Sequence, residues 1–90
     1  MGLVVTGRVV KAVSADGTLL GRKCTVVGIA IVTVGATDSI ELRDGGAAGV
    51  IKVPAIDADG IIFIPMNVPF NTDLYANVTG TTARYIVICD

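Results

Sequence analysis

The residues of this chain that could do chemistry are two cysteines and a balanced set of charged side chains, because the sequence contains no histidine. Histidine is the commonest general base, and a cysteine nucleophile usually relies on an imidazole partner. Cys24 and Cys89 stand far apart, without the paired-Cys spacing of zinc modules. We therefore expect no enzyme, with no catalytic residue, no cofactor and no metal site, and predict that both cysteines are structural. A disulfide between them stays open.

Two short motifs resemble known ligand loops but lack the residues that would complete them. Asp57-Ala58-Asp59-Gly60 begins like a calcium loop, and no later glutamate closes it. The glycine-rich segment 45–49 lacks the Lys-Ser/Thr ending that would grip phosphates. Both are interpreted as turns.

Charge and hydropathy exclude several classes of partner. A net charge of -1 with dispersed arginines gives no electrostatic footprint for nucleic acid or an anionic membrane, and four aromatic residues are too few for base stacking. The longest apolar stretch, residues 24–36, is interrupted by threonine and glycine and is shorter than the roughly 20 residues of a spanning helix. The first ten residues do not read as a signal peptide. We expect neither nucleic acid nor membrane as a partner.

The elements that must position these residues are strands. Val and Ile fill 24 of 90 positions against five Leu, which is typical of strands rather than helices. Three Asp-Gly pairs, at 16–17, 44–45 and 59–60, predict tight turns of the hairpin type. The predicted strands are 3–13, 19–20, 23–34, 39–43, 50–53, 61–64, 74–79 and 84–89. We expect residues 1–90 to form one all-β domain, a small antiparallel β-sandwich or jelly-roll-like barrel of about seven or eight strands.

Self-association is expected, because small domains are usually stabilised by disulfides, metal or association, and the metal option lacks histidine. Several strands are apolar on both faces, and a two-sheet core can cover only one face of each. The candidate contact residues in such strands are Val26, Ile29, Ile31, Val32, Ile62 and Ile64. For each of them, an ordinary place in the core is the alternative.

Residues 39–88 resemble small tailed-phage virion proteins. The resemblance is carried by the strand 40–43 ending in Asp44-Gly45, the small-residue tip 47–49, the segment Val68-Pro69-Phe70 leading to Leu74, and the Thr79-Gly80 turn before the last strand. It implies a compact β-sandwich that decorates the capsid or forms a head-fibre-like component. It also implies a homotrimer that contacts a major capsid protein in a virion assembled in the host cytoplasm.

Two alternatives remain open. Residues 5–10, with 20–23 after them, look like the opening of the pentameric vertex proteins of bacterial microcompartments, although the later glycine-rich signature and closing segment of that family are absent. Fibre tips with a sandwich architecture also include carbohydrate- or receptor-binding modules. Sugar sites stack rings on aromatic side chains, and only Tyr75 and Tyr85 could serve here.

Overall fold

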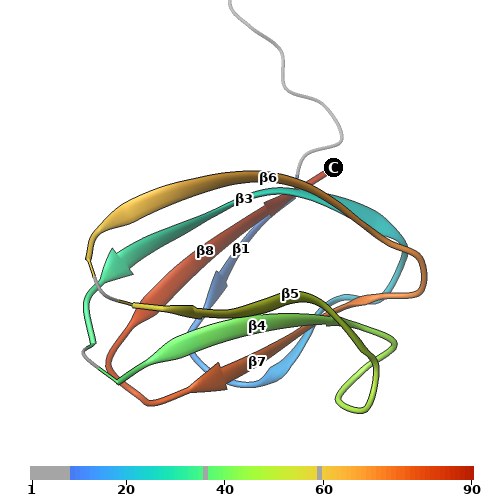
Figure 1. The fold of residues 1–90 in the computed structure, drawn as a ribbon. Coiled ribbons are helices and arrows are strands. Elements are labelled where there is room, and N and C mark those ends of the chain that lie inside the picture. Colours follow the sequence, from blue (N-terminus) through green and yellow to red (C-terminus); the bar gives the residue numbers. More distant parts are fainter. Residues whose placement is uncertain (1–8, 36, 59) are drawn as a thin grey trace, which may run out of the picture.

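The structure is a computed structural model that describes residues 9–35, 37–58 and 60–90. This part of the chain contains eight strands (Figure 1). They are β1 (Val9–Val13), β2 (Gly17–Leu20), β3 (Cys24–Thr33), β4 (Ser39–Asp44), β5 (Val50–Asp57), β6 (Ile62–Phe70), β7 (Leu74–Thr79) and β8 (Arg84–Cys89). The predicted first strand is confirmed over β1, and its part 3–8 lies outside the described residues. β5 and β6 are longer than predicted, since each continues through a proline.

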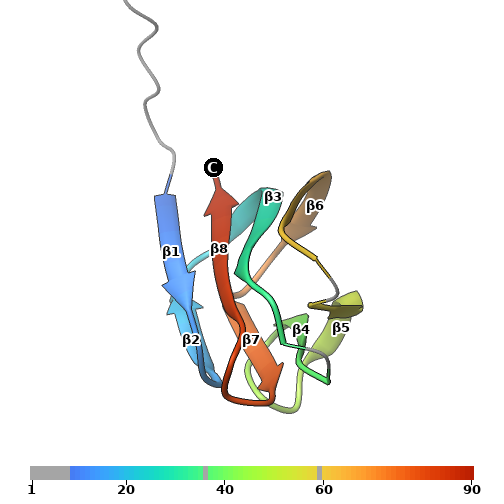
Figure 2. The same ribbon diagram turned by 90° about the vertical axis from the view of Figure 1, so that its left-hand side faces the viewer.

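The strands are wound as four nested antiparallel pairs. β1 pairs with β8, β2 with β7, β3 with β6 and β4 with β5. Two further pairings, β3 with β8 and β4 with β7, join these ribbons into sheets of order β1-β8-β3-β6 and β2-β7-β4-β5. The two sheets stack as the layers of a sandwich (Figure 2). This winding is the jelly-roll arrangement, and it confirms the predicted fold class.

The hydrophobic core lies between the inner faces of the two sheets. Alternation along β4 turns Ile40 and Leu42 inward, where both are fully buried, and β8 turns Tyr85, Val87 and Cys89 inward in the same way. Such burial contributes about 25 cal/mol per Å² of apolar surface removed from water. Because successive side chains point to opposite faces of a strand, every second residue lies in the core and stabilises the fold.

Only one of the three Asp-Gly pairs lies in a hairpin. Asp44 and Gly45 begin the tip between the paired strands β4 and β5, and Gly45 and Gly46 there adopt φ of +104° and +84°, which favour glycine. Asp16 and Gly17 instead connect β1 to β2, which belong to different sheets, so the hairpin prediction is wrong there. Gly60 likewise lies between sheets, and Asp59 is outside the described residues.

A buried carboxylate ties the loops together at one end of the sandwich. Asp38, just before β4, is 5% exposed, and its Oδ2 accepts hydrogen bonds from the backbone N–H groups of Thr82 (2.8 Å) and Ala83 (2.6 Å) in the β7–β8 turn. Its own backbone accepts from Ala58 after β5 and donates to Gly35 after β3. One residue thereby connects three loops, and its carboxylate has hydrogen-bond donors in place of a cation.

Space for this carboxylate comes from Gly80, where φ is +88° and an added Cβ would lie 1.8 Å from the Asp38 side chain. A side chain at position 80 would therefore both strain the backbone and displace the carboxylate.

Two aspartates clasp each other's turns at the opposite end. The Asp44 carboxylate accepts the backbone N–H groups of Asn71, Thr72 and Asp73 in the β6–β7 turn, at 2.8, 2.9 and 3.3 Å. In return, Asp73 Oδ1 accepts those of Gly45 (2.9 Å) and Gly46 (3.1 Å) in the β4–β5 tip. The hydrogen bonds from Asn71 and Thr72 lower the pKa of Asp44 below its ordinary value. This clasp joins the β4–β5 hairpin to the connection between the two sheets.

Asp38→Ala should lower the free energy of unfolding by about 2 to 5 kcal/mol, because it leaves the Thr82 and Ala83 N–H groups buried without an acceptor. Asp38→Asn keeps one acceptor oxygen and should lose less. Urea unfolding followed by circular dichroism measures both. The exposed Asp57→Ala is the control, expected within about 0.5 kcal/mol of wild type, and an Asp38→Ala value equally small would contradict the bridging role.

Candidate interaction surface

The outer face of the β1-β8-β3-β6 sheet is apolar in its two central cross-strand rows. Each row contains one outward residue from every strand of the sheet, as the pairing register shows. We call this set the outer face; its rows are Val10–Ile88–Gly28–Pro65 and Ala12–Ile86–Ala30–Phe63. None of the eight residues is charged or carries a polar side chain. Antiparallel sandwiches normally present polar residues to water on such a face, so the outer face is the anomaly of this molecule.

Phe63 lies across the outer face rather than projecting from it. An added Cβ at Gly28 would stand 2.3 Å from the Phe63 ring, so the ring of β6 covers the glycine of the neighbouring β3. The side chain nevertheless remains 51% exposed. Because Gly28 has no side chain, the Phe63 ring can lie against β3. The outer face therefore includes an aromatic ring that lies along the sheet.

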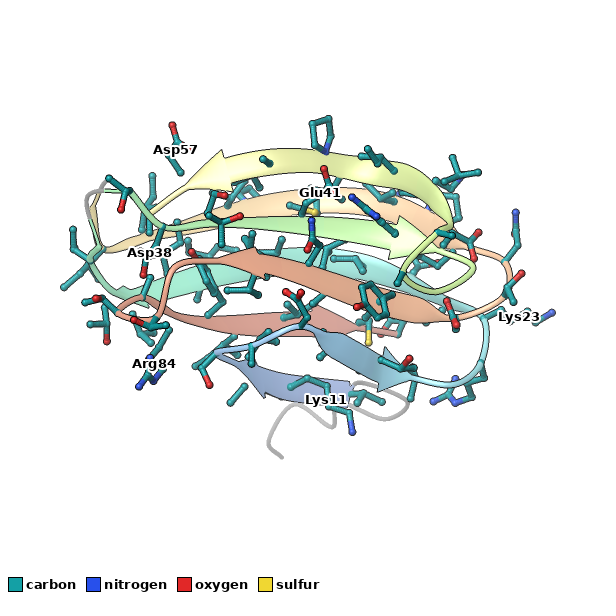
Figure 3. The ribbon with its side chains drawn as sticks, turned by 90° about the horizontal axis from the view of Figure 1, so that it is seen from below. Lys11, Lys23, Asp38, Glu41, Asp57 and Arg84 are labelled. Atoms are coloured by element: carbon teal, nitrogen blue, oxygen red, sulfur yellow. The ribbon has the colours of Figure 1, made fainter. Side chains whose placement is uncertain are left out.

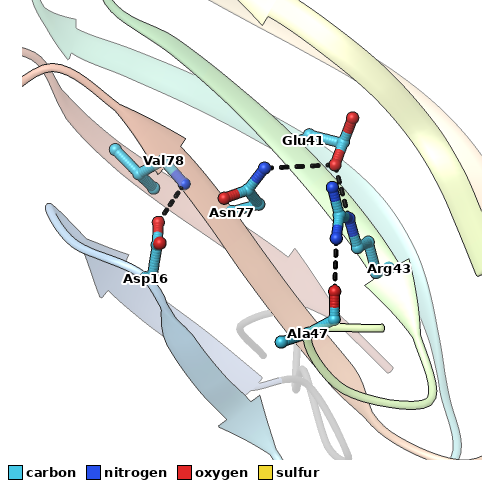
Figure 4. A network of polar contacts seen from close by, with 6 residues as sticks. All are labelled: Asp16, Glu41, Arg43, Ala47, Asn77 and Val78. Carbon is cyan, nitrogen blue, oxygen red and sulfur yellow. Dashed lines mark hydrogen bonds and ion pairs between the residues drawn. The ribbon is translucent and has the colours of Figure 1, made fainter. Parts of the chain in front are cut away.

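The outward surface of the other sheet carries charged and polar side chains on its two central strands, β4 and β7, beside the exposed Val50 and Ile51 on its edge strand β5. Glu41 and Arg43 on β4 form an ion pair with Nε 2.6 Å from Oε1, and Asn77 on β7 donates to the same oxygen at 3.3 Å (Figure 4). Arg43 also donates to the carbonyl of Ala47 in the β4–β5 tip. In Figure 3, which views the molecule from this side, Glu41 projects toward the viewer. The contrast between the two outward surfaces singles out the apolar one as a site of contact.

Several features of the edge strands discourage sheet-to-sheet addition. β6 carries Pro65 and Pro69 and β5 carries Pro54, and a proline cannot donate to a neighbouring strand. β1 places Lys11 opposite the buried Val87, on the inner side of the edge, and β2 is short and irregular. These are the usual devices against edge-to-edge pairing. They leave the outer face, rather than an edge, as the surface available for association.

The six contact residues expected from the sequence fall into three groups. Val26, Ile29 and Ile31 are at most 1% exposed and belong to the core of the single chain, which is the alternative that the sequence left open. Val32 and Ile62 are exposed, and Ile64 is half-buried against the core. The structure places Ile62 and Ile64 with Ile31, Ile61 and Gly60 around a hollow beside β6.

The residues that sequence reasoning missed are those of the outer face. Their signal was present, because segment 85–89 is apolar at both alternating sets of positions. In β3, a bulge after Val26 shifts the alternation within the strand. Ile29 and Ile31 therefore turn inward, and Gly28 and Ala30 face outward.

The two cysteines are free thiols in the core, and they interact. Cys24 begins β3 and Cys89 ends β8, on neighbouring strands of one sheet. Burial, the charge of Cys89 and a side-chain hydrogen bond to Cys89 raise the pKa of Cys24 from 9.0 to about 11. Arg22 opposes this rise and Asp44 adds to it. Cys24 is therefore almost wholly protonated at neutral pH and is a poor nucleophile there.

Tyr85 is a second buried group held in its neutral form. It is fully buried, and its hydroxyl has no hydrogen-bond partner among the described residues. Burial, followed by the charges of Asp38 and Asp57, raises the pKa of Tyr85 above its ordinary value. A sugar ring cannot stack on a side chain so enclosed, so of the two aromatic candidates only the half-buried Tyr75 remains.

No three or more His, Cys, Asp or Glu side chains within residues 9–35, 37–58 and 60–90 are placed to hold a metal ion. The same ranges contain no helix long and apolar enough to cross a membrane.

Comparisons with protein-family models, with curated proteins and with solved structures gave no match. The likeness of residues 39–88 to phage virion proteins is thus carried by the quoted residues alone.

Stability should decline as the pH rises above about 9. The folded pKa of Cys24, about 11, exceeds the ordinary 9.0 of an unfolded chain, so its contribution is complete below pH 9 and is lost as the pH rises through 11. Tyr85 acts in the same direction. Urea unfolding at a series of pH values measures the decline. Cys24→Ala and Tyr85→Phe should each flatten it, and an unchanged slope in both would show that these groups do not cause it.

Proposed function

We propose that this protein is a non-enzymatic structural component that works by association, and that the outer face is its contact surface. The observation that carries the proposal is the pair of uncharged rows across β1, β8, β3 and β6, opposite a sheet whose two central strands carry the Glu41–Arg43 ion pair and Asn77. Exposure of such a face to water is unfavourable. Binding of another protein surface removes it from water, and this burial favours association.

The virion setting is part of this proposal. The resemblance of residues 39–88 supports a capsid decoration or head-fibre-like component that self-associates, with three copies as the implied number, and contacts a major capsid protein. The jelly-roll winding is compatible with a virion protein, because viral capsid domains use it. Lectins and cupins use it too, so the fold alone does not choose among these functions. The outer face favours a protein partner, since it offers no polar group to orient a sugar.

The test compares two exposed valines on edge strands. Val10, 62% exposed on β1, belongs to the outer face, whereas Val50, 67% exposed on β5, lies in the other sheet. We expect the wild type to form oligomers of its 9.2 kDa chain in light scattering. Val10→Lys should raise the dissociation constant about 10-fold or more, because an ammonium would be buried against apolar groups, and Val50→Lys should leave it unchanged.

Two results would count against the proposal. A wild-type chain that stays monomeric at high concentration and does not sediment with capsids would contradict association. Binding on a glycan array that disappears in Tyr75→Ala would favour the carbohydrate-binding alternative instead. Equal effects of the two lysine substitutions would show that association uses another surface.

A further inference from the structure

The register of β3 and β8 brings Cys24 and Cys89 together. Val26 faces Cys89 across the two strands, and Thr25 exchanges both backbone hydrogen bonds with Asp90, at 3.1 and 2.8 Å. Cys24 is therefore the next inward residue beyond Val26 and a diagonal neighbour of Cys89. The two residues, 65 positions apart in sequence, lie near enough for Cys89 to contribute to the raised pKa of Cys24.

Cys24 is the less enclosed of the two residues, with 7% of its surface exposed against 0% for Cys89. It lines a surface hollow together with Arg22, Lys23, Phe70, Asn71 and Asp90, whereas Cys89 is fully enclosed. Figure 3 shows Lys23 at this end of the molecule, opposite the end that carries Arg84.

We propose that Cys24 and Cys89 form an oxidation site that closes to a disulfide by exchange with a small-molecule disulfide such as oxidised glutathione. Cys24 is the attacking residue and Cys89 the resolving residue. This site is independent of the outer face, and it goes beyond the proposed structural role.

The exchange balances in two steps. The Cys24 thiolate attacks one sulfur of oxidised glutathione, forms a mixed disulfide and releases one glutathione thiolate, which takes up the proton that Cys24 lost. The Cys89 thiolate then attacks the Cys24 sulfur, and the second glutathione leaves with the proton of Cys89. The two protein thiols lose two electrons and two protons in total, and oxidised glutathione gains them. Closure needs the sulfurs to approach to about 2.05 Å.

The compartment decides which form exists. A reducing cytoplasm keeps the pair as thiols, and an oxidising environment outside the cell favours the disulfide. The disulfide would join the start of β3 to the end of β8 and close a loop of most of the chain. Long loops lose the most unfolded-state entropy when they are cross-linked, so oxidation should strengthen the native state.

The test exposes the reduced full chain to oxidised glutathione at mildly alkaline pH and counts thiols after denaturation. We expect both thiols to disappear, the intact mass to fall by two hydrogen atoms without intermolecular cross-links, and the urea midpoint to rise. Cys89→Ser should stop at the mixed disulfide and retain one glutathionyl group on Cys24. Cys24→Ser should react at least about 10-fold more slowly than Cys89→Ser, because its remaining thiol is buried.

Three results would overturn the proposal. These are two thiols that persist in the wild type, a product cross-linked between chains, or Cys24→Ser modified as fast as Cys89→Ser. Alanine replacements at both positions repeat the comparison if a buried serine prevents folding. Association through the outer face is measured separately, so failure here leaves the proposed function untouched.

Discussion

A β-sheet has two faces, and a two-layer sandwich covers only one face of each sheet. In this chain the covered faces hold the core, including Ile40, Leu42 and Val87. The uncovered faces differ, because one bears the Glu41–Arg43 ion pair and the other bears only apolar residues in its two central rows. The proposed association depends on this difference. Apolar groups that the fold itself cannot enclose are a surface for another protein to enclose.

Carboxylates tie together the loops at the two ends of the sandwich. A jelly roll sends most of its connections from one sheet to the other, so these loops contain backbone N–H groups that no ladder satisfies. Asp38 accepts two of them at one end, and Asp44 with Asp73 accepts five at the other. These carboxylates are stabilised mainly by backbone donors, and the charge of Lys52 adds a smaller contribution at Asp44. The carboxylates of Asp38, Asp44 and Asp73 thus hold loops together.

The proposed association and the proposed oxidation act on different parts of the same sheet. The outer face is directed away from the core, whereas Cys24 and Cys89 point into it from the ends of β3 and β8. The edge prolines Pro54, Pro65 and Pro69 limit uncontrolled strand addition, which a chain with so many Val and Ile residues would otherwise favour. The sheet can therefore present an apolar face for a defined partner while its edges stay protected.

The sequence by itself determined the class of fold and the approximate place of all eight strands, because β-branched content, alternation and glycine turns act locally. It also indicated that apolar residues outnumber the places in a two-layer core. Only the tertiary structure decided which residues are left outside. A bulge in β3 after Val26 shifts the alternation by one residue, which turns Ile31 inward and Ala30 outward. The sequence left a disulfide between Cys24 and Cys89 open, and only strand pairing across the whole chain places the two residues near each other.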